Sequence, residues 1–332
     1  MLITNFTASP LFSGVNPRRG LPVTNILSYE ASTKRGQGHC CHRLQHANVL
    51  YMGDADLIGD DQSPRMADLQ GTSHGEKFDY VVGSPHLRHA ALFDRVVRAI
   101  NEAIETVVSR QGTCDVLEVG AGHGTFTESA MASGARVTVT EMSRPSVDYL
   151  QEKFANNPSV SIIYDEDGEE AFRLQRQYDV VLFISVLHHI PDYLGVVGRM
   201  TEQLVRPGGA IVAYQDPLWY PRQSRLSKVV TMASYFAWRV TQGELKRGLG
   251  TRWRRLRGHL DEGNVSDMVE YHVVRQGVDD QGLRKLLAED FDAVTIDEYW
   301  STQSPALQYL GTGRVPPNTF GLVALGRKPR SS

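Results

Sequence analysis

Three glycines at alternating positions are the first residues whose spacing indicates chemistry. Gly120, Gly122 and Gly124 lie between the apolar run Val116–Val119 and a stretch with helical patterning. Glycine has no Cβ atom, so it adopts positive φ easily and lets another group approach the backbone closely. Three alternating glycines exceed what a tight turn requires, so we expect this turn to bind a ligand. A dinucleotide, a phosphate or a ligand that is neither would each suit such a turn.

The residues around the glycines weaken the dinucleotide alternative without excluding it. A dinucleotide-binding turn places a small residue at position 125, where it seats the helix near the pyrophosphate. Thr125 stands there instead, and the third glycine comes one position early. Glu141 ends the next apolar run and suits a ribose diol, because a carboxylate accepts hydrogen bonds from hydroxyls. Since NAD and S-adenosylmethionine both contain a ribose, Glu141 indicates adenosine without choosing between them.

An alternation of apolar runs and helical stretches predicts the framework that positions these residues. An amphipathic helix is indicated first, by one apolar stripe of Leu87, Leu92, Val96, Ile100 and Ile104. Strands are expected over residues 114–120, 135–142, 160–164, 178–185 and 208–215. The helices expected between them cover residues 126–133, 143–156, 169–173 and 191–205. Apolar strands separated by helices predict a doubly wound α/β fold that binds ligands at the carboxyl ends of its strands.

The C-terminal third departs from this alternation. Residues 216–270 are expected to form a helical lid, an insertion that binds the acceptor. A helix over 278–291 and strands over 292–300 and 319–328 follow it. These last two strands are joined by a stretch without an evident helix, which indicates a terminal antiparallel hairpin on a seven-stranded, mostly parallel sheet. The whole domain is expected to span residues 76–332.

Five motifs in order along the chain resemble those of class I S-adenosylmethionine-dependent methyltransferases, especially the small-molecule enzymes that modify natural products. They are the glycine turn with the acidic residue before it, Glu141, the acidic run after residue 164, "YDVVLFISVLHHIPD" and "LVRPGGAIVAY". The resemblance covers residues 80–215 and, more loosely, the last 60 residues. It implies a Rossmann-like methyltransferase fold, an enzyme, and S-adenosyl-L-methionine as the cofactor.

The resemblance also assigns cofactor contacts residue by residue. Glu118, two positions before the first glycine, is typical of the first motif, and Glu141 matches the acid that binds the ribose. Asp165 matches the position beside the adenine amine, with Glu166 or Asp167 as the alternative. The other expected cofactor-binding residues are Gly120, Ala121, Gly122, Gly124, Met142 and Ser185.

His188 and His189 follow the fourth expected strand, at the ligand-binding edge. Methyl transfer from a sulfonium is an in-line displacement, so the enzyme mainly positions the acceptor and excludes water. A hydroxyl or protonated-amine acceptor must also lose a proton, and histidine suits that step near neutral pH. The paired histidines resemble those of small-molecule O-methyltransferases, and Asp216 after the fifth strand is a third catalytic candidate. We slightly prefer His189 over His188 as the base; alternatively, one histidine only packs or helps to close the cofactor pocket.

The acceptor is expected to be a small specialised metabolite, such as an antibiotic intermediate, methylated on oxygen or nitrogen. Its expected contacts are Tyr80, His86, Tyr235 and Trp238. The basic residues of the lid form a solvated face in the preferred interpretation. They also leave open an acidic or phosphorylated acceptor or contact with an anionic membrane, with RNA ranked last. A catalytically silent cofactor-binding module and a nicotinamide-dependent reductase are the alternative functions.

Composition limits the remaining possibilities. The 332 residues are 41% hydrophobic with a net charge of −3, which gives no global bias toward nucleic acid or stable membrane insertion. Three cysteines make no disulfide framework, so a reducing, cytoplasmic location is expected. Homo-oligomerisation is left open.

The N-terminal residues 1–75 lack sustained periodicity and are expected to be a disordered extension. They also suggest a translated upstream region, with the natural start at Met66 or Met52. A cluster of possible metal ligands falls in this segment, namely Cys40, Cys41, His42 and His46. We expect no metal there, because adjacent cysteines do not fit the usual ligand spacing.

Overall fold

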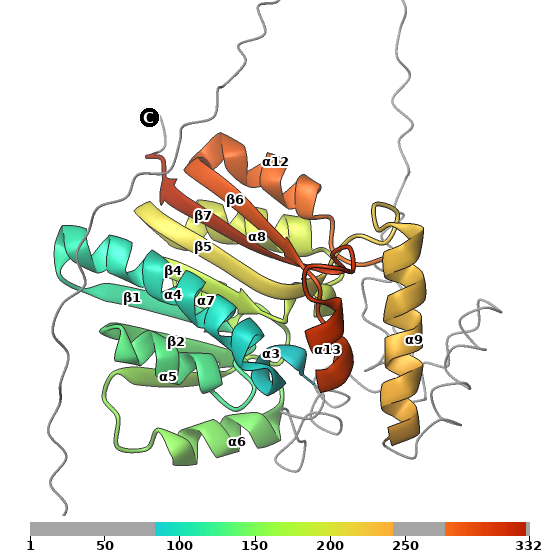
Figure 1. Cartoon of the computed structure of the whole chain (residues 1–332). Coiled ribbons are helices and arrows are strands. Elements are labelled where there is room, and N and C mark those ends of the chain that lie inside the picture. Colours follow the sequence, from blue (N-terminus) through green and yellow to red (C-terminus); the bar gives the residue numbers. More distant parts are fainter. Residues whose placement is uncertain (1–83, 242–275, 330–332) are drawn as a thin grey trace, which may run out of the picture. The chain divides into compact units, whose positions relative to one another are not determined.

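The computed structural model describes residues 84–241 and 276–329, all within the compact unit Asp60–Ser332 (Figure 1). Four sequence-based predictions lie outside the described residues: the N-terminal extension, the Cys40–His46 cluster, Tyr80, and the lid beyond residue 241.

A seven-stranded sheet in the order β3-β2-β1-β4-β5-β7-β6 forms the middle layer. Its strands are β1 (Cys114–Val119), β2 (Ala135–Glu141), β3 (Val160–Tyr164), β4 (Tyr178–Ile184), β5 (Val205–Pro217), β6 (Phe291–Tyr299) and β7 (Thr319–Arg327). Strands β1 to β5 pair in parallel, whereas β7 runs antiparallel to β5 and β6. The predicted fold and its terminal antiparallel pair are therefore confirmed. The strand order reverses between β1 and β4, and ligands bind at such a switch point.

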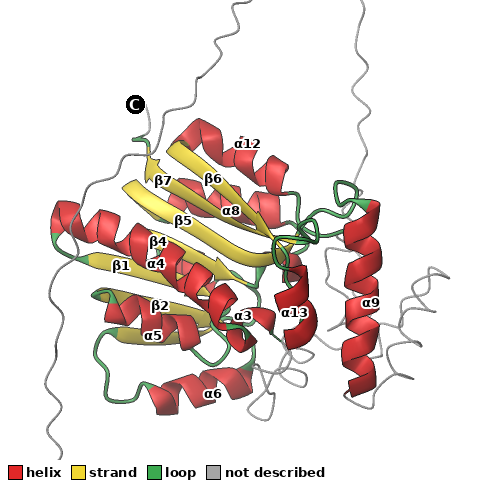
Figure 2. Cartoon of the chain, in the orientation of Figure 1, coloured by secondary structure: helices red, strands yellow, loops and turns green. Residues whose placement is uncertain are grey.

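Helices cover both faces of the sheet (Figure 2). One face packs against α4 (Ala90–Gln111), α5 (Thr125–Ala132) and α6 (Arg144–Lys153). The other packs against α7 (Glu170–Arg173), α8 (Tyr193–Gln203) and α12 (Asp280–Asp290). Neighbouring strand residues alternate between the two cores, as Val116 and Leu117 do in β1. This two-sided burial explains why the strands are apolar throughout.

The ends of the helices follow from their capping residues. Ser143 caps α6 by accepting a hydrogen bond from the backbone N–H of Ser146. Asp192 and Asp279 cap α8 and α12 in the same way. Side-chain oxygens at these positions satisfy N–H groups that have no partner within the helix. Local sequence therefore fixes where these helices begin.

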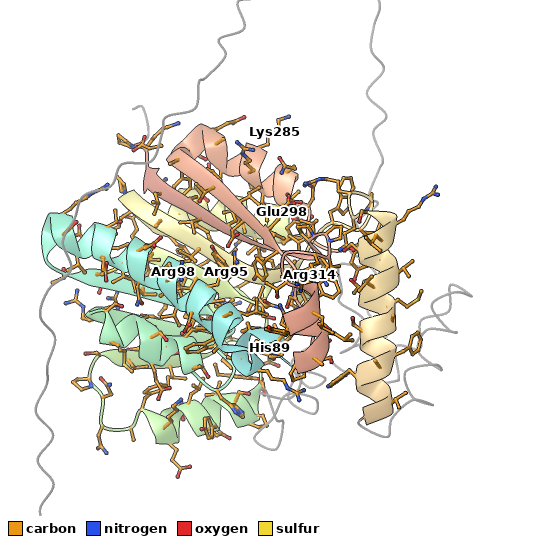
Figure 3. The ribbon with its side chains drawn as sticks, viewed as in Figure 1. His89, Arg95, Arg98, Lys285, Glu298 and Arg314 are labelled. Atoms are coloured by element: carbon orange, nitrogen blue, oxygen red, sulfur yellow. The ribbon has the colours of Figure 1, made fainter. Side chains whose placement is uncertain are left out.

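The long helix α4 buries most of the stripe predicted for it. Leu92, Val96, Ile100 and Ile104 are buried, while Leu87 belongs to a separate short helix, α3 (Pro85–Arg88). On another side of α4, the Arg95 guanidinium lies 2.6 Å from Oδ1 of Asp297 in β6 (Figure 3). This contact joins the N-terminal helix to the C-terminal hairpin.

The connection between β6 and β7 differs from the prediction. A seven-residue helix, α13 (Pro305–Gly311), lies in the stretch where no helix was expected. Proline near the first position of a helix is favourable because its missing N–H would have no partner there. Seven residues are too few to show a clear helical period, so the pattern missed it. In the expected lid, α9 (Arg225–Thr241) is helical.

Candidate functional site

The glycine turn joins β1 to α5, and its three glycines have φ values of 67°, 56° and 73°. A Cβ atom on Gly124 would lie 2.8 Å from Cδ2 of Leu150 and 2.8 Å from Cε2 of Phe154. A Cβ atom on Gly120 would lie 2.9 Å from Cγ2 of Val186, just after β4. Backbone conformation and close packing therefore both require glycine at these positions.

Glu141, the last residue of β2, is held against this turn. The backbone N–H of Gly122 donates to its Oε2 at 2.9 Å, and that of Ser143 donates to its Oε1 at 2.9 Å. Burial raises the pKa of Glu141, and the backbone donors limit that rise. A carboxylate has about four acceptor positions, so acceptor capacity remains for hydroxyl donors. The carboxylate is thus oriented before any ligand arrives.

Two more acidic residues are buried at the same edge. The hydroxyl of Thr127 in α5 donates to Oε2 of Glu118 at 2.5 Å, and burial raises the pKa of Glu118 to about 7. Asp165 follows β3, where its Oδ1 accepts from the backbone N–H of Glu170 at 3.2 Å. Burial also raises the pKa of Asp165. Both carboxyls have protein partners that fix their orientation.

The remaining predicted cofactor-binding residues gather at the same end of the sheet. Ala121 lies in the turn after β1, Met142 follows β2, Glu166 follows Asp165, and Ser185 follows β4. All four are partly buried. The structure therefore brings the predicted set together at the carboxyl ends of four neighbouring strands, β1 to β4. Their contact with a cofactor stays a prediction.

A histidine and an aspartate meet beside these residues. His188 lies in the short 3-10 helix η1 (Leu187–His189) after β4, and Asp216 lies near the end of β5. Nδ1 of His188 is 2.7 Å from Oδ1 of Asp216, and the backbone N–H of His188 donates to the same oxygen at 3.1 Å. Both side chains are buried. The carboxyl thus fixes the imidazole through its Nδ1 atom.

Burial also sets the charge of this pair. It raises the pKa of Asp216 to about 8 and lowers the pKa of His188 to about 3. Low dielectric disfavours the ionised form of each group, because it loses the solvation that water supplies. At pH 7 the imidazole is therefore neutral and the Asp216 carboxyl holds its proton.

His189 and His86 lie close to this pair. The rings of His188 and His189 have centroids 4.1 Å apart, and His189 is only partly buried. The ring of His86, in α3, stacks on Phe126 with centroids 5.7 Å apart. Burial, and secondarily the nearby His188, lowers the pKa of His86 to about 3. The three predicted histidines therefore lie at one end of the sheet. His188 and His189 are in η1, and His86 packs against the first turn of α5.

The lid residues that were expected to contact the acceptor lie in α9. Tyr235 and Trp238 are partly buried, with ring centroids 6.3 Å apart. The helix is joined to the segment before β7, because Ser227 Oγ donates to the carbonyl of Pro317 at 2.9 Å. Contact of these aromatic residues with an acceptor stays a prediction.

The sequence did not point to Gln215, Tyr299 and Ser301. Gln215 directly precedes Asp216, and its side chain is hydrogen-bonded to the other two. The Gln215 amide donates to Ser301 Oγ at 2.8 Å and accepts from Tyr299 Oη at 3.1 Å. Their only sequence signal is position, since each lies at or just beyond the end of an expected strand. The pairing itself needs the tertiary structure, because more than 80 residues separate Gln215 from both partners.

Residues 84–241 and 276–329 contain neither a cluster of metal ligands nor a helix that could span a membrane. No group of three or more His, Cys, Asp or Glu side chains there is arranged to hold a metal ion. Nor is any described helix both long enough and apolar enough to cross a membrane.

Residues 117–211 match the family described as "Methyltransferase domain". The ubiquinone biosynthesis O-methyltransferase of Leptothrix cholodnii is 31% identical over 108 residues, which are 32% of this chain and 46% of that protein. The enzyme of the same name from Citrobacter koseri is 35% identical over 97 residues, 29% of this chain and 40% of that protein. The chain therefore spans less than half the length of these relatives.

Among solved structures, the N-methyltransferase NodS from Bradyrhizobium japonicum, in complex with S-adenosylhomocysteine, is 16% identical with a TM-score of 0.40. That match covers 75% of this chain and 91% of NodS. The family match spans the glycine turn, the end of β2 and the His188 segment, which are the motifs that the sequence analysis identified. Over residues 117–211 the chain is therefore similar to methyltransferase domains of the kind that use S-adenosylmethionine.

Proposed function

We propose that this protein transfers a methyl group from S-adenosylmethionine to a hydroxyl or amine of a small-molecule acceptor, with His188 as the general base. One observation carries the proposal: the His188–Asp216 pair lies at the ends of β4 and β5, and β4 is the direct neighbour of β1, which the glycine turn follows. A base with its orienting carboxyl therefore adjoins the expected cofactor edge. Acyl- and methyl-transfer enzymes alike need such a base where a hydroxyl must lose its proton.

The residues at this edge fit S-adenosylmethionine. Gly120 and Gly124 let protein side chains pack directly against the turn and fix its shape, since a side chain on either glycine would collide with these neighbours. Glu141 would accept hydrogen bonds from the ribose hydroxyls, because two backbone N–H groups already aim its carboxylate. Asp165 would accept from the adenine amine. When bound, the cofactor supplies a methyl group on a positively charged sulfur, and its transfer leaves S-adenosylhomocysteine.

The protein's own contribution is to remove the proton. When Nδ1–H of His188 donates to Asp216, the lone pair of the ring lies on Nε2. That nitrogen takes the proton of the acceptor hydroxyl as the new bond to the methyl carbon forms. Asp216 then stabilises the imidazolium. General-base assistance of this kind raises rates by roughly 10²- to 10⁴-fold.

Oxygen is the preferred acceptor atom. The two curated relatives carry the name O-methyltransferase. A hydroxyl also needs a base more than a neutral amine does, which suits a site built around His188 and Asp216. A specialised metabolite as acceptor, a cytoplasmic location, and a lid formed by α9 complete the proposal. Tyr235 and Trp238 would then cover an aromatic acceptor.

Calorimetry and labelling test this function. The full chain is titrated with S-adenosylmethionine, S-adenosylhomocysteine and NAD⁺ in separate runs. It is then incubated with methyl-labelled S-adenosylmethionine and a panel of catechols, phenols and aromatic amines. We expect micromolar binding of the first two compounds and label in a catechol or phenol. Saturation by NAD⁺ alone would overturn the cofactor, whereas tight cofactor binding without any labelled product would indicate a silent binding module.

A further inference from the structure

A β-bulge lies immediately before Asp216. In the antiparallel pairing of β5 with β7, Tyr214 faces Gly321 and Asp216 faces Phe320, so Gln215 has no partner. Gln215 has a φ of 67°. It is one of three non-glycine residues with positive φ in the described part of the chain, and Ser185 beside the same site is another. Such a conformation is strained for a residue that has a Cβ atom, unless the surroundings hold it.

The bulge decides which face of the sheet Asp216 occupies. Val212 and Tyr214 belong to the core on the α4 face, whereas Ile211 and Ala213 belong to the core on the α8 face. Side chains alternate along a strand, so an unbroken β5 would place Asp216 with Tyr214. After the extra residue, Leu218 packs in the core on the α8 face, together with Leu187 of η1. The bulge therefore turns Asp216 toward η1, where it meets His188.

Hydrogen bonds at both ends of the Gln215 side chain hold this conformation. Its amide nitrogen donates to Ser301 Oγ, and its amide oxygen accepts from Tyr299 Oη. Ser301 is fixed in turn, because its backbone N–H donates to Oδ1 of Asn318 at 2.8 Å. The Arg95 guanidinium lies 4.8 Å from the centroid of the Tyr299 ring. The partners of Gln215 are therefore themselves held.

Glutamine is an unfavourable choice for the backbone alone. Glycine adopts φ near +60° without strain, yet this position carries a long side chain whose two polar atoms are both bonded. We propose that Gln215 is a positioning residue: its side-chain amide, clamped by Tyr299 and Ser301, stabilises the left-handed bulge that places Asp216 against Nδ1 of His188. This inference rests on the proposed function only for its catalytic consequence. The positioning itself is a property of the folded chain.

The tautomer of His188 reports the positioning directly. We would label the full-length protein with ¹⁵N-histidine and record long-range ¹H–¹⁵N spectra at pH 9, where Asp216 is ionised. His188→Gln assigns the resonance. In the unaltered protein, His188 is expected to carry its proton on Nδ1, because the carboxylate accepts it there.

Gln215→Met keeps the size of the side chain and removes both hydrogen bonds. We expect it to move the His188 proton from Nδ1 to a mixture of the two nitrogens. Gln215→Gly should restore the Nδ1–H form, because glycine needs no clamp to hold positive φ. Thr201→Val is the control: Thr201 is buried, and its hydroxyl donates to the carbonyl of Val197 within α8. That variant should leave the tautomer unchanged.

The outcomes separate this inference from the proposed function. An unchanged Nδ1–H form in Gln215→Met, or an equal loss in Gln215→Gly, would overturn the positioning role. Failure to bind S-adenosylhomocysteine in calorimetry would overturn the proposed function while leaving the tautomer result intact. If both hold, Gln215→Met should lower kcat for a labelled catechol about tenfold, with the Kd for S-adenosylhomocysteine within threefold. Should Gln215→Met fold poorly, Tyr299→Phe removes one of the two bonds and is expected to shift the same resonance partially.

Discussion

Nδ1 of His188 lies 2.7 Å from Oδ1 of Asp216, although 28 positions separate them in the chain. Each residue follows or ends its own strand, β4 or β5, and these strands are direct neighbours in the sheet. The contact gives His188 the orienting carboxyl that a general base requires. The sequence slightly favoured His189, and the role of each histidine stays a prediction.

Replacing His188 should separate catalysis from cofactor binding. We expect His188→Gln to lower kcat by about 10²- to 10⁴-fold, because a glutamine does not take up the acceptor proton. Its Kd for S-adenosylhomocysteine should change less than threefold. His189→Gln is the matched control, with an expected loss below tenfold. Rates are measured with methyl-labelled cofactor, and a larger loss in His189→Gln would reverse the assignment.

The rate of methyl transfer should rise with pH. Burial raises the pKa of Asp216 to about 8, so at lower pH its carboxyl holds a proton. We expect that proton to bond to Nδ1 of His188, which leaves the ring's own proton on Nε2. Above that pKa the carboxylate accepts Nδ1–H, and Nε2 becomes basic. We therefore expect kcat to increase through a pH near 8 and then level off. In Asp216→Asn this inflection should disappear; a profile that falls between pH 6.5 and 9 would contradict the proposed base.

Glu141 should contribute to cofactor affinity through its charge. We expect Glu141→Gln to raise the Kd for S-adenosylmethionine roughly 10- to 100-fold, because hydrogen bonds to a charged acceptor contribute about 1.5–3 kcal/mol. Asp292→Asn is the control, since Asp292 is exposed at the start of β6, the edge strand on the other side of the sheet. Isothermal titration measures both variants. Equal affinities for the two would remove Glu141 from the cofactor site.

Gly124→Ala should destabilise the fold more than Gly134→Ala, a substitution at another glycine with positive φ. The added methyl group would meet Leu150 and Phe154 at 2.8 Å, in addition to the strain of positive φ. Overpacking of this kind costs about 1–3 kcal/mol. Gly134→Ala is the control, because its φ is 87° but no atom lies within 4 Å of the added carbon. Chemical denaturation should show the difference, and equal losses would mean that α6 moves aside.

Glu118 should make stability depend on pH. Burial raises its pKa to about 7 in the folded state, above the value of an exposed glutamate, so the folded state holds the proton more tightly. This contribution is fully present below pH 4.5 and is lost as pH rises through 7. Relative to the unaltered protein, Glu118→Gln should therefore gain about 3 kcal/mol between pH 4 and pH 8. Glu128→Gln, on the exposed face of α5, controls for loss of a carboxylate in thermal unfolding.

The sequence alone predicted most of the elements and the edge of the sheet at which a cofactor is expected to bind. Apolar runs buried on both faces identify the strands, because a parallel sheet covered by helices leaves neither face to water. The glycines and Glu141 can be recognised from the sequence, because a tight turn and the end of a strand depend on neighbouring residues. The same reasoning failed for α13, where seven residues show no period, and where Pro305 at the start was the only signal.

Only the tertiary structure decided how Asp216 acts. In a regular strand, successive side chains point to opposite faces of the sheet. A regular β5 would therefore put Asp216 on the same face as Tyr214, away from His188. The extra residue at Gln215 reverses that alternation, and it is held by side chains from β6 and the segment after it. Such long-range contacts produce no periodic pattern of residues, so the sequence does not reveal them. The sequence therefore places His188 and Asp216 at the same edge, and the packing of β6 and β7 beside β5 brings the two side chains together.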